Sequence, residues 1–248
     1  MTRPPLQAGA LSRALGPQGW RVEVVPTATS TNSLVAERAR AGEPAGLVIV
    51  AEHQTAGRGR LDRAWESPPR AGLTFSVLLR PDSPVARWPW LTLLAGVAVV
   101  RPLREHAGVD AQLKWPNDVL VGERKVAGML AEATGQGALV VGIGLNVSTR
   151  RDELPHLAAT SLALEGAEVT ERDTLLRAIL RALSDVLAHP DELRDSYRAL
   201  CGTLGREVRL ALPDGAEVRG VAEQVDEEGR LVVSGVAYGV GDVVHVTR

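Results

Sequence analysis

Glycine and arginine alternate in one segment of the chain, Gly57–Arg60, and Arg63 and Trp65 follow shortly after it. Glycines let backbone amides approach a ligand closely, and guanidinium groups bind anionic oxygens, so this segment suits a phosphate. If the segment is extended, Arg58 and Arg60 project to the same side. A solvated basic loop without a ligand is the alternative, and the segment alone does not decide between the two.

A second group of polar residues follows at the end of an expected strand, in Lys114–Asp118. Pro116 cannot donate a ladder hydrogen bond and so ends that strand. The segment then offers an ammonium, the amide of Asn117 and the carboxylate of Asp118 together, which suits a nucleotide and its Mg²⁺. A plain turn beside a surface lysine explains the same residues without any chemistry.

Two glycines and a lysine stand out in the next two expected strands. Gly142 and Gly144 share one face of a strand, where they clear a strip on which a flat ligand could lie. Lys125 shares its face with the small Ala127, so its ammonium can reach into a pocket. A glycine-weakened strand beside a surface lysine is the alternative.

Of the 28 lysines and arginines only Lys114 and Lys125 are lysines. Coding bias explains the arginine excess, yet a retained lysine indicates that a compact ammonium is needed.

The elements that must position these residues follow from the hydrophobic pattern. Strands are expected over 20–25, 46–52, 73–79, 111–115, 119–121, 126–133 and 138–147, and helices over 31–41, 88–106, 171–188 and 190–200. Strands this closely spaced favour antiparallel or mixed pairing. Thr29, Ser30 and Thr31 would supply capping hydroxyls for the first of these helices. Residues 53–70 fit no periodicity and are expected as a loop.

The pattern of expected elements changes after Gly202, from helices to short strands. Short strands are expected over 208–212, 217–225, 231–233 and 243–246, separated by glycine-rich turns. This pattern predicts a small all-β barrel or sandwich that needs the main body for its stability. We therefore expect a catalytic domain over 1–202 and a small β domain over 203–248.

Composition narrows the class of protein. A formal net charge of −2 gives no general attraction to nucleic acid or to an anionic membrane. The single cysteine, Cys201, excludes an intrachain disulfide and fits a reducing compartment. The N-terminus has no visible export signal, and the longest apolar run, 91–100, is too short to span a bilayer. A soluble, cytoplasmic protein with neither nucleic acid nor membrane as a partner is expected.

Taken in order, five motifs resemble those of the biotin protein ligases. They are Ser30–Asn32, Gly57–Arg60 with Arg63 and Trp65, Lys114–Asp118, Arg124–Gly128 and Gly142–Asn146, and the resemblance is strong over about residues 20–150. It implies an α+β fold like that of class II synthetases, a mixed sheet with helices on one face, followed by a small SH3-like barrel. It also implies activation of biotin by ATP to biotinyl-5′-AMP, with Mg²⁺, and transfer to a lysine of a biotin carboxyl carrier protein of a biotin-dependent carboxylase. The oligomeric state stays open, with a homodimer as one option.

The resemblance also assigns residues to roles. Lys125, at the biotin carboxylate, and Arg60, on the phosphate, are the catalytic pair. The biotin site takes Ser30, Thr31, Asn32, Gln54, Gly57, Arg58, Gly59, Arg60, Lys125, Gly142 and Gly144. The ATP or adenylate site takes Arg58, Arg60, Arg63, Trp65, Lys114, Asn117, Asp118 and Asn146, with Asp118 as the magnesium ligand.

Two departures and two rivals accompany this interpretation. Asp62 stands where many members of the family have glycine, and it either pairs with a neighbouring arginine or faces solvent. Nineteen residues precede Trp20, too few for a helix-turn-helix, so we expect the form without an N-terminal DNA-binding domain. A lipoate ligase or octanoyl transferase of the same fold is one rival, but the arginine and triple-glycine loop of those enzymes is absent. A non-catalytic biotin or nucleotide sensor is the other, and the intact Lys125 and Asp118 favour catalysis over it.

Overall fold

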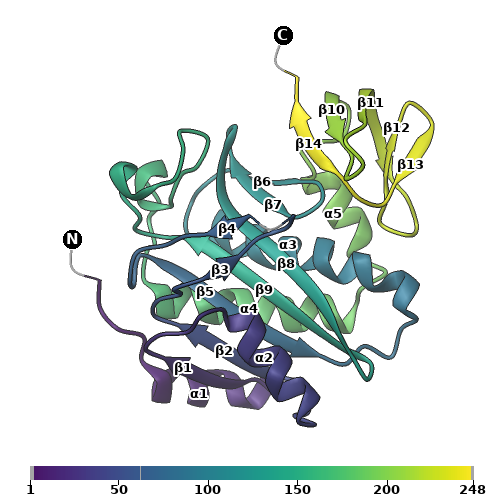
Figure 1. The fold of residues 1–248 in the computed structure, drawn as a ribbon. Coiled ribbons are helices and arrows are strands. Elements are labelled where there is room, and N and C mark those ends of the chain that lie inside the picture. The colour runs from purple at the N-terminus through teal and green to yellow at the C-terminus, as the bar shows by residue number, and fades with distance from the viewer. Residues whose placement is uncertain (1–2, 62, 247–248) are drawn as a thin grey trace.

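A seven-stranded mixed sheet forms the centre of the computed structural model, which describes residues 3–61 and 63–246 (Figure 1). In spatial order its strands are β1 (Arg21–Val25), β2 (Leu47–Ala51), β5 (Gly72–Leu79), β9 (Ala138–Asn146), β8 (Arg124–Gly135), β7 (Asp118–Val121) and β6 (Ala111–Lys114). The β1–β2 pair is parallel and every other pair is antiparallel, so the expected mixed pairing is confirmed. Asp62 lies outside the described residues.

Five α-helices flank this sheet within the described residues. They are α1 (Ala8–Leu15), α2 (Thr31–Arg40), α3 (Trp88–Glu105), α4 (Arg172–Ala188) and α5 (Arg194–Leu200). Short 3-10 turns cover Gly16–Gln18, Val85–Arg87, Arg151–Glu153 and Ala163–Glu165. Helices α1, α3, α4 and α5 share one large core, as expected, but α2 packs on the other face, where Val35 and Ala39 meet Leu47 and Ile49. Both faces of β2 are buried, and α2 supplies the second cover.

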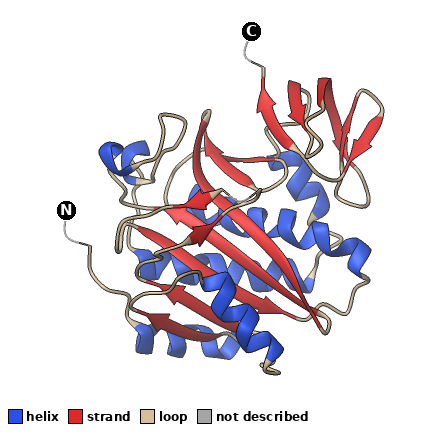
Figure 2. Ribbon diagram, in the orientation of Figure 1, coloured by secondary structure: helices blue, strands red, loops and turns tan. Residues whose placement is uncertain are grey.

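A smaller sheet, drawn in red at the upper right of Figure 2, lies near the C-terminus. It contains five antiparallel strands in the order β13-β12-β11-β10-β14. These are β10 (Glu207–Ala211), β11 (Glu217–Val225), β12 (Leu231–Val233), β13 (Val236–Tyr238) and β14 (Asp242–His245). Such a sheet is consistent with the small SH3-like unit that was expected, although β13 was not. The division after residue 202 stays a prediction.

The turn between β11 and β12 attaches this sheet to the main body. The indole nitrogen of Trp90 donates to the carbonyl of Glu227 at 2.9 Å, and that of Trp115 donates to the carbonyl of Gly229 at 3.0 Å. Arg194 and Arg198 lie over the Trp90 ring, with their guanidinium carbons 5.1 and 5.5 Å from its centroid. The two hydrogen bonds therefore join the turn to the main body, and the cation–π contacts hold the Trp90 ring in place from α5.

The segment expected as a loop, 53–70, contains a short hairpin of β3 (Gly57–Arg58) and β4 (Ala64–Trp65). A Cβ atom on Gly57 would overlap the Trp65 carbonyl and the Gln54 amide, so only glycine fits at this crossing. The hairpin lies across the central sheet in Figure 1.

Throughout the described part of the chain, every helix is too short or too polar to cross a lipid bilayer.

Candidate active site

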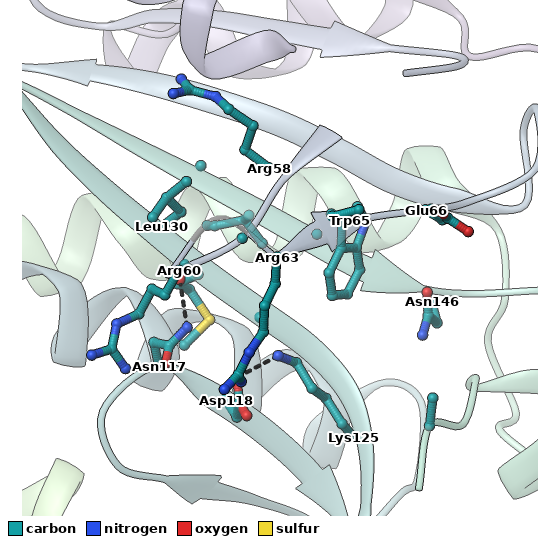
Figure 3. Close-up of a pocket in the computed structure, with 18 of the residues that line it drawn as sticks. Arg58, Arg60, Arg63, Trp65, Glu66, Asn117, Asp118, Lys125, Leu130 and Asn146 are labelled. Atoms are coloured by element: carbon teal, nitrogen blue, oxygen red, sulfur yellow. Dashed lines mark hydrogen bonds and ion pairs between the residues drawn. The ribbon is translucent and has the colours of Figure 1, made fainter. Parts of the chain in front are cut away.

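A cavity of about 480 Å³ lies between the β3–β4 hairpin, the start of α2, strands β8 and β9, and β14 of the small sheet (Figure 3). All the expected site residues except Gly57 line it. They are Ser30, Thr31, Asn32, Gln54, Arg58, Gly59, Arg60, Arg63, Trp65, Lys114, Asn117, Asp118, Lys125, Gly142, Gly144 and Asn146. Both lysines of the sequence are among them. Gly57 packs beside the cavity instead.

Uncharged polar groups gather at the α2 end of the cavity. Ser30 occupies the N-cap position of α2, but its hydroxyl makes no capping hydrogen bond, so the expected cap is wrong. The backbone N–H and the hydroxyl of Thr31 both donate to Gln54 Oε1, at 2.8 and 3.1 Å. Because only an oxygen can accept from a backbone N–H, the Gln54 amide is oriented with its oxygen toward Thr31, and its NH₂ group stays available as a donor.

Asn32 is buried beside these groups and held from three sides. Its Nδ2 donates to the Glu132 carboxylate at 2.6 Å and to the Leu130 carbonyl at 3.2 Å. Its Oδ1 accepts from the Ser76 hydroxyl at 2.6 Å. The amide covers Gly142, where a Cβ atom would overlap it. One half of the expected glycine strip is therefore already filled by the chain.

The three arginines of the hairpin point in different directions. Arg60 donates to Asn117 Oδ1 at 3.1 Å and to the Gly241 carbonyl at 3.3 Å, and Arg63 pairs with Asp242. Arg58 turns the other way and pairs with Glu132 at 3.0 Å (Figure 3). The expectation that Arg58 and Arg60 project to one side is wrong, because β3 ends at Arg58 and the chain bends before Arg60.

Cationic groups gather at the opposite end, where the carboxylates of Asp118, Glu123 and Asp242 also line the cavity. Lys125 Nζ lies 2.6 Å from Asp118 Oδ1 and 5.8 Å from the centroid of the Trp65 ring. The Lys125 main chain is fixed from both sides, donating to the Ala158 carbonyl and accepting from the Thr160 N–H, each at 2.8 Å. Burial lowers the pKa of Lys114 below the usual lysine value, and the charge of Asp118 only partly opposes this.

The second half of the glycine strip holds the indole of Trp65. A Cβ atom on Gly144 would overlap this ring, and one on Gly128 would touch its edge. A flat ligand on β9 must therefore lie against the indole or displace it, which corrects the expectation of an open strip. Within the described residues the Trp65 ring nitrogen is buried without a hydrogen-bond partner, so it can donate to a ligand.

Asn146 and Asn117 occupy fixed positions on the cavity wall. The side chain of Asn146 is buried and donates to the Thr160 carbonyl at 2.9 Å, which ties β9 to the segment that also holds Lys125. The amide of Asn117 donates to the Met129 carbonyl at 2.9 Å, which leaves its oxygen to Arg60. Both amides are thus oriented by the main chain of neighbouring segments.

The structure adds site residues that the sequence did not suggest. Asp242 and His245 of β14 and His156 of the segment after β9 line the cavity, and Glu132 reaches its edge through Asn32 and Arg58. Burial, together with the neighbouring Arg206, lowers the pKa of His245. The even spacing of Glu132 from Gly128 and Leu130 on one strand face could have indicated it, whereas β14 reaches the site only through tertiary docking.

Comparisons with known proteins show the family of the chain. Residues 24–148 match the Biotin/lipoate A/B protein ligase family. A Biotin--[acetyl-CoA-carboxylase] ligase of Mycobacterium tuberculosis is 42% identical, over 98% of this chain and 97% of the relative. The Bifunctional ligase/repressor BirA of Escherichia coli is 31% identical, over 92% of this chain and 74% of its own. The structure of a biotin protein ligase from Aquifex aeolicus in complex with biotin and ATP superposes with a TM-score of 0.79 and 29% identity, over 91% of this chain and 99% of that one. This chain therefore belongs to the biotin/lipoate A/B protein ligase family, among its biotin protein ligases.

Proposed function

We propose that this protein activates biotin with ATP to biotinyl-5′-AMP and transfers the biotinyl group to a lysine of a biotin carboxyl carrier protein. One observation carries the proposal: a single cavity joins an uncharged polar end, at Thr31 and Gln54, to a cationic end, at Arg60, Lys114 and Lys125. A relative that aligns over nearly the whole chain is a Biotin--[acetyl-CoA-carboxylase] ligase.

The uncharged end suits the bicyclic head of biotin. A ureido group presents two N–H donors and one carbonyl acceptor in a compact unit. The NH₂ group of Gln54 can donate to the carbonyl, and the hydroxyl of Ser30 can accept from an N–H. Because these side chains are held by α2 and by one another, little conformational entropy is lost when biotin binds.

The cationic end suits the adenylation step. The biotin carboxylate attacks the α-phosphorus of ATP, a new P–O bond forms, the α–β phosphoanhydride bond breaks, and pyrophosphate leaves. This brings two anions together, so positive groups must neutralise the developing charge. Lys125 would hold the carboxylate oxygen, and Arg60 and Lys114 would hold phosphate oxygens.

Arg63 and Arg58 receive different roles. Arg63 pairs with Asp242, and a phosphate would compete with that carboxylate for its guanidinium. Arg58 points away from this end toward Glu132, so we assign it to the biotin end of the site rather than to the phosphate.

Magnesium fits this end of the site as a companion of the triphosphate. Mg²⁺ is commonly held by one or two carboxylates together with phosphate oxygens and water. The described residues contain no group of three or more His, Cys, Asp and Glu side chains able to hold a metal ion by themselves. Asp118, with Asn117 beside it, would hold the ion, which would neutralise phosphate charge when bound.

Transfer needs an entering amine rather than a nucleophile of this chain. The carrier lysine attacks the biotinyl carbonyl, a C–N bond forms, the C–O bond to AMP breaks, and the amine loses a proton. Cys201, the single thiol in the sequence, is buried against Tyr197 and is not among the residues that line the cavity, and burial raises its pKa. A thioester intermediate has therefore no support here.

The test is biotin-dependent exchange of pyrophosphate into ATP by the purified protein. Lipoate and octanoate serve as alternative acids, because an enzyme acting on those substrates would need no partners for a ureido group. Transfer is then measured to a biotin carboxyl carrier domain and to its variant with arginine at the acceptor lysine. Exchange with lipoate or octanoate but not biotin would refute the proposal, and biotin binding without exchange would favour a non-catalytic sensor.

Two further expectations remain proposals. We propose a cytoplasmic location, because a chain with a single cysteine fits a reducing compartment. A homodimer is tested by light scattering with and without biotin and ATP, and a mass of one chain under both conditions would reject it.

A further inference from the structure

The carboxylate of Glu132 makes contacts that the proposed reaction does not use. Glu132 lies on β8, on the same face of the strand as Gly128 and Leu130, both of which line the cavity. Its Oε2 accepts two hydrogen bonds, from Asn32 Nδ2 at 2.6 Å and from Arg58 at 3.0 Å. One oxygen atom therefore joins the central sheet to two other segments.

These two segments are the ones that enclose the uncharged end of the cavity. Asn32 stands in the first turn of α2, and Arg58 ends strand β3. Arg58 also donates to the Ser33 hydroxyl of the same turn, at 3.3 Å. The start of the hairpin is thus anchored to α2 and to β8 through the Arg58 guanidinium.

The same carboxylate fixes which way the Asn32 amide points. An ionised carboxylate only accepts hydrogen bonds, so it selects the Nδ2 side of the amide. The Oδ1 atom is then directed to Ser76 and lies over Gly142 at the floor of the cavity. With an apolar side chain in place of Glu132, the Nδ2 atom would keep only its longer hydrogen bond to the Leu130 carbonyl, at 3.2 Å, so the amide would be held less firmly.

The ion pair itself adds little to folding. The side chains of Arg58 and Glu132 are 48% and 31% exposed, and pairs exposed to this degree contribute little to the free energy of unfolding. Its effect is therefore expected on the geometry of the cavity and much less on the stability of the chain.

We propose that Glu132 is a positioning residue for biotin binding, which acts through Asn32 and Arg58 to hold the hairpin over the biotin end of the cavity. This inference rests on the proposed function, because it assumes that biotin occupies that end. It assigns Glu132 no contact with the reacting atoms.

The experiment compares Glu132→Ala and Glu132→Gln with the wild type. We expect Glu132→Ala to weaken biotin binding about tenfold by calorimetry and to raise the KM for biotin accordingly, because a charge-assisted contact is lost. The KM for ATP should stay within about twofold, since the cationic end is untouched. Glu132→Gln, which keeps an acceptor for Asn32, should lose less than Glu132→Ala.

Two further variants separate positioning from a general structural effect. Glu23→Ala removes a carboxylate from Arg38 at the other end of α2, and it should leave both KM values unchanged. In the Arg58→Ala background, the Glu132→Gln change should have almost no further effect on biotin affinity, because the two residues act as one unit. Thermal melts check that every variant is folded.

The outcomes are distinct. Biotin affinity that is unchanged in folded Glu132→Ala, or a loss that is equal for biotin and ATP, would overturn this inference while the proposed function stands. A wild type without biotin-dependent exchange would overturn the proposed function. Effects of Glu132→Gln and Arg58→Ala that simply add would overturn the part of the inference that runs through Arg58.

Discussion

Lys125→Ala separates the proposed chemistry from the stability of the fold. In the structure the Lys125 ammonium lies 2.6 Å from the Asp118 carboxylate, and the two side chains are 31% and 20% exposed. Its loss would leave Asp118 without its cation at the place where, by the proposed mechanism, the biotin carboxylate approaches the phosphate. The variant thus removes an attraction and exposes a repulsion at once.

The magnitude follows from Coulomb's law. Two unit charges about 4 Å apart interact by about 4 kcal/mol at an effective dielectric constant of about 20, the value suited to partly buried sites. A loss of about 3–4 kcal/mol in the transition state slows adenylation roughly a hundred- to a thousandfold. The same ion pair contributes only about 0–1 kcal/mol to folding, because both groups are partly exposed.

The assay is biotin-dependent ATP–pyrophosphate exchange, with a thermal melt of each variant. Arg124→Ala is the matched control, because it removes the neighbouring cation of β8, whose guanidinium pairs with Glu165 at 2.8 Å and does not line the cavity. Lys125→Arg should also be slow, since a planar guanidinium does not replace a compact ammonium. Exchange by Lys125→Ala within a few-fold of the wild type, or a loss matched by Arg124→Ala, would refute the reasoning.

Three further predictions use other parts of the cavity. Arg60→Gly should still form the adenylate but release it roughly ten- to a hundredfold faster, because a charge-assisted hydrogen bond is lost. Biotinylation of an unrelated lysine-rich protein measures the released adenylate. If that protein stays unlabelled, the prediction is wrong. Lys114→Met should raise the Tm by about 2–4 °C at neutral pH, the shift that about 1 kcal/mol produces in a chain of this size, while weakening ATP binding. Burial lowers the pKa of Lys114, so the folded wild type loses the charge of this lysine as the pH rises toward the ordinary lysine pKa. The gain in Tm of Lys114→Met should therefore shrink at high pH. A gain in Tm that is constant with pH would contradict desolvation of Lys114 as its cause. Amides of residues 55–70 should exchange hydrogen more slowly once biotin and ATP are bound, and equal rates in both states would contradict a loop that orders on binding.

Much of the fold could be predicted because its elements have strong local signals. The apolar run at 46–52 and the long helix after Arg87 appear as β2 and α3 almost as expected. Strand β13 was missed because its three residues lie between Gly235 and Gly239, too short a stretch to show alternation. The helix expected from Pro190 begins only at Arg194, since the residues before it form a turn.

The site was predictable in composition but not in its contacts. Motif spacing selected residues that line one cavity in the structure, yet it could not show that Trp65 covers Gly144 or that Arg58 turns away from Arg60. These arrangements depend on the bend of the hairpin and on Glu132 of another strand. The pairing of Arg63 with Asp242 depends in the same way on how the small sheet docks, which no local pattern encodes.

The placement of both lysines in one cavity has a practical consequence for handling the protein. The sequence holds no other lysine, so the outer surface offers no lysine amine to an acylating reagent. Amine-reactive labels therefore become probes of the cavity, apart from the α-amino group, and substrates should shield Lys114 and Lys125 from them. For the same reason, coupling the protein to amine-reactive beads would modify the lysines of the proposed active site as well as the α-amino group, and attachment through another kind of side chain avoids this. A carboxylic mixed anhydride released from the cavity would likewise have no lysine to acylate on the outer surface of this protein.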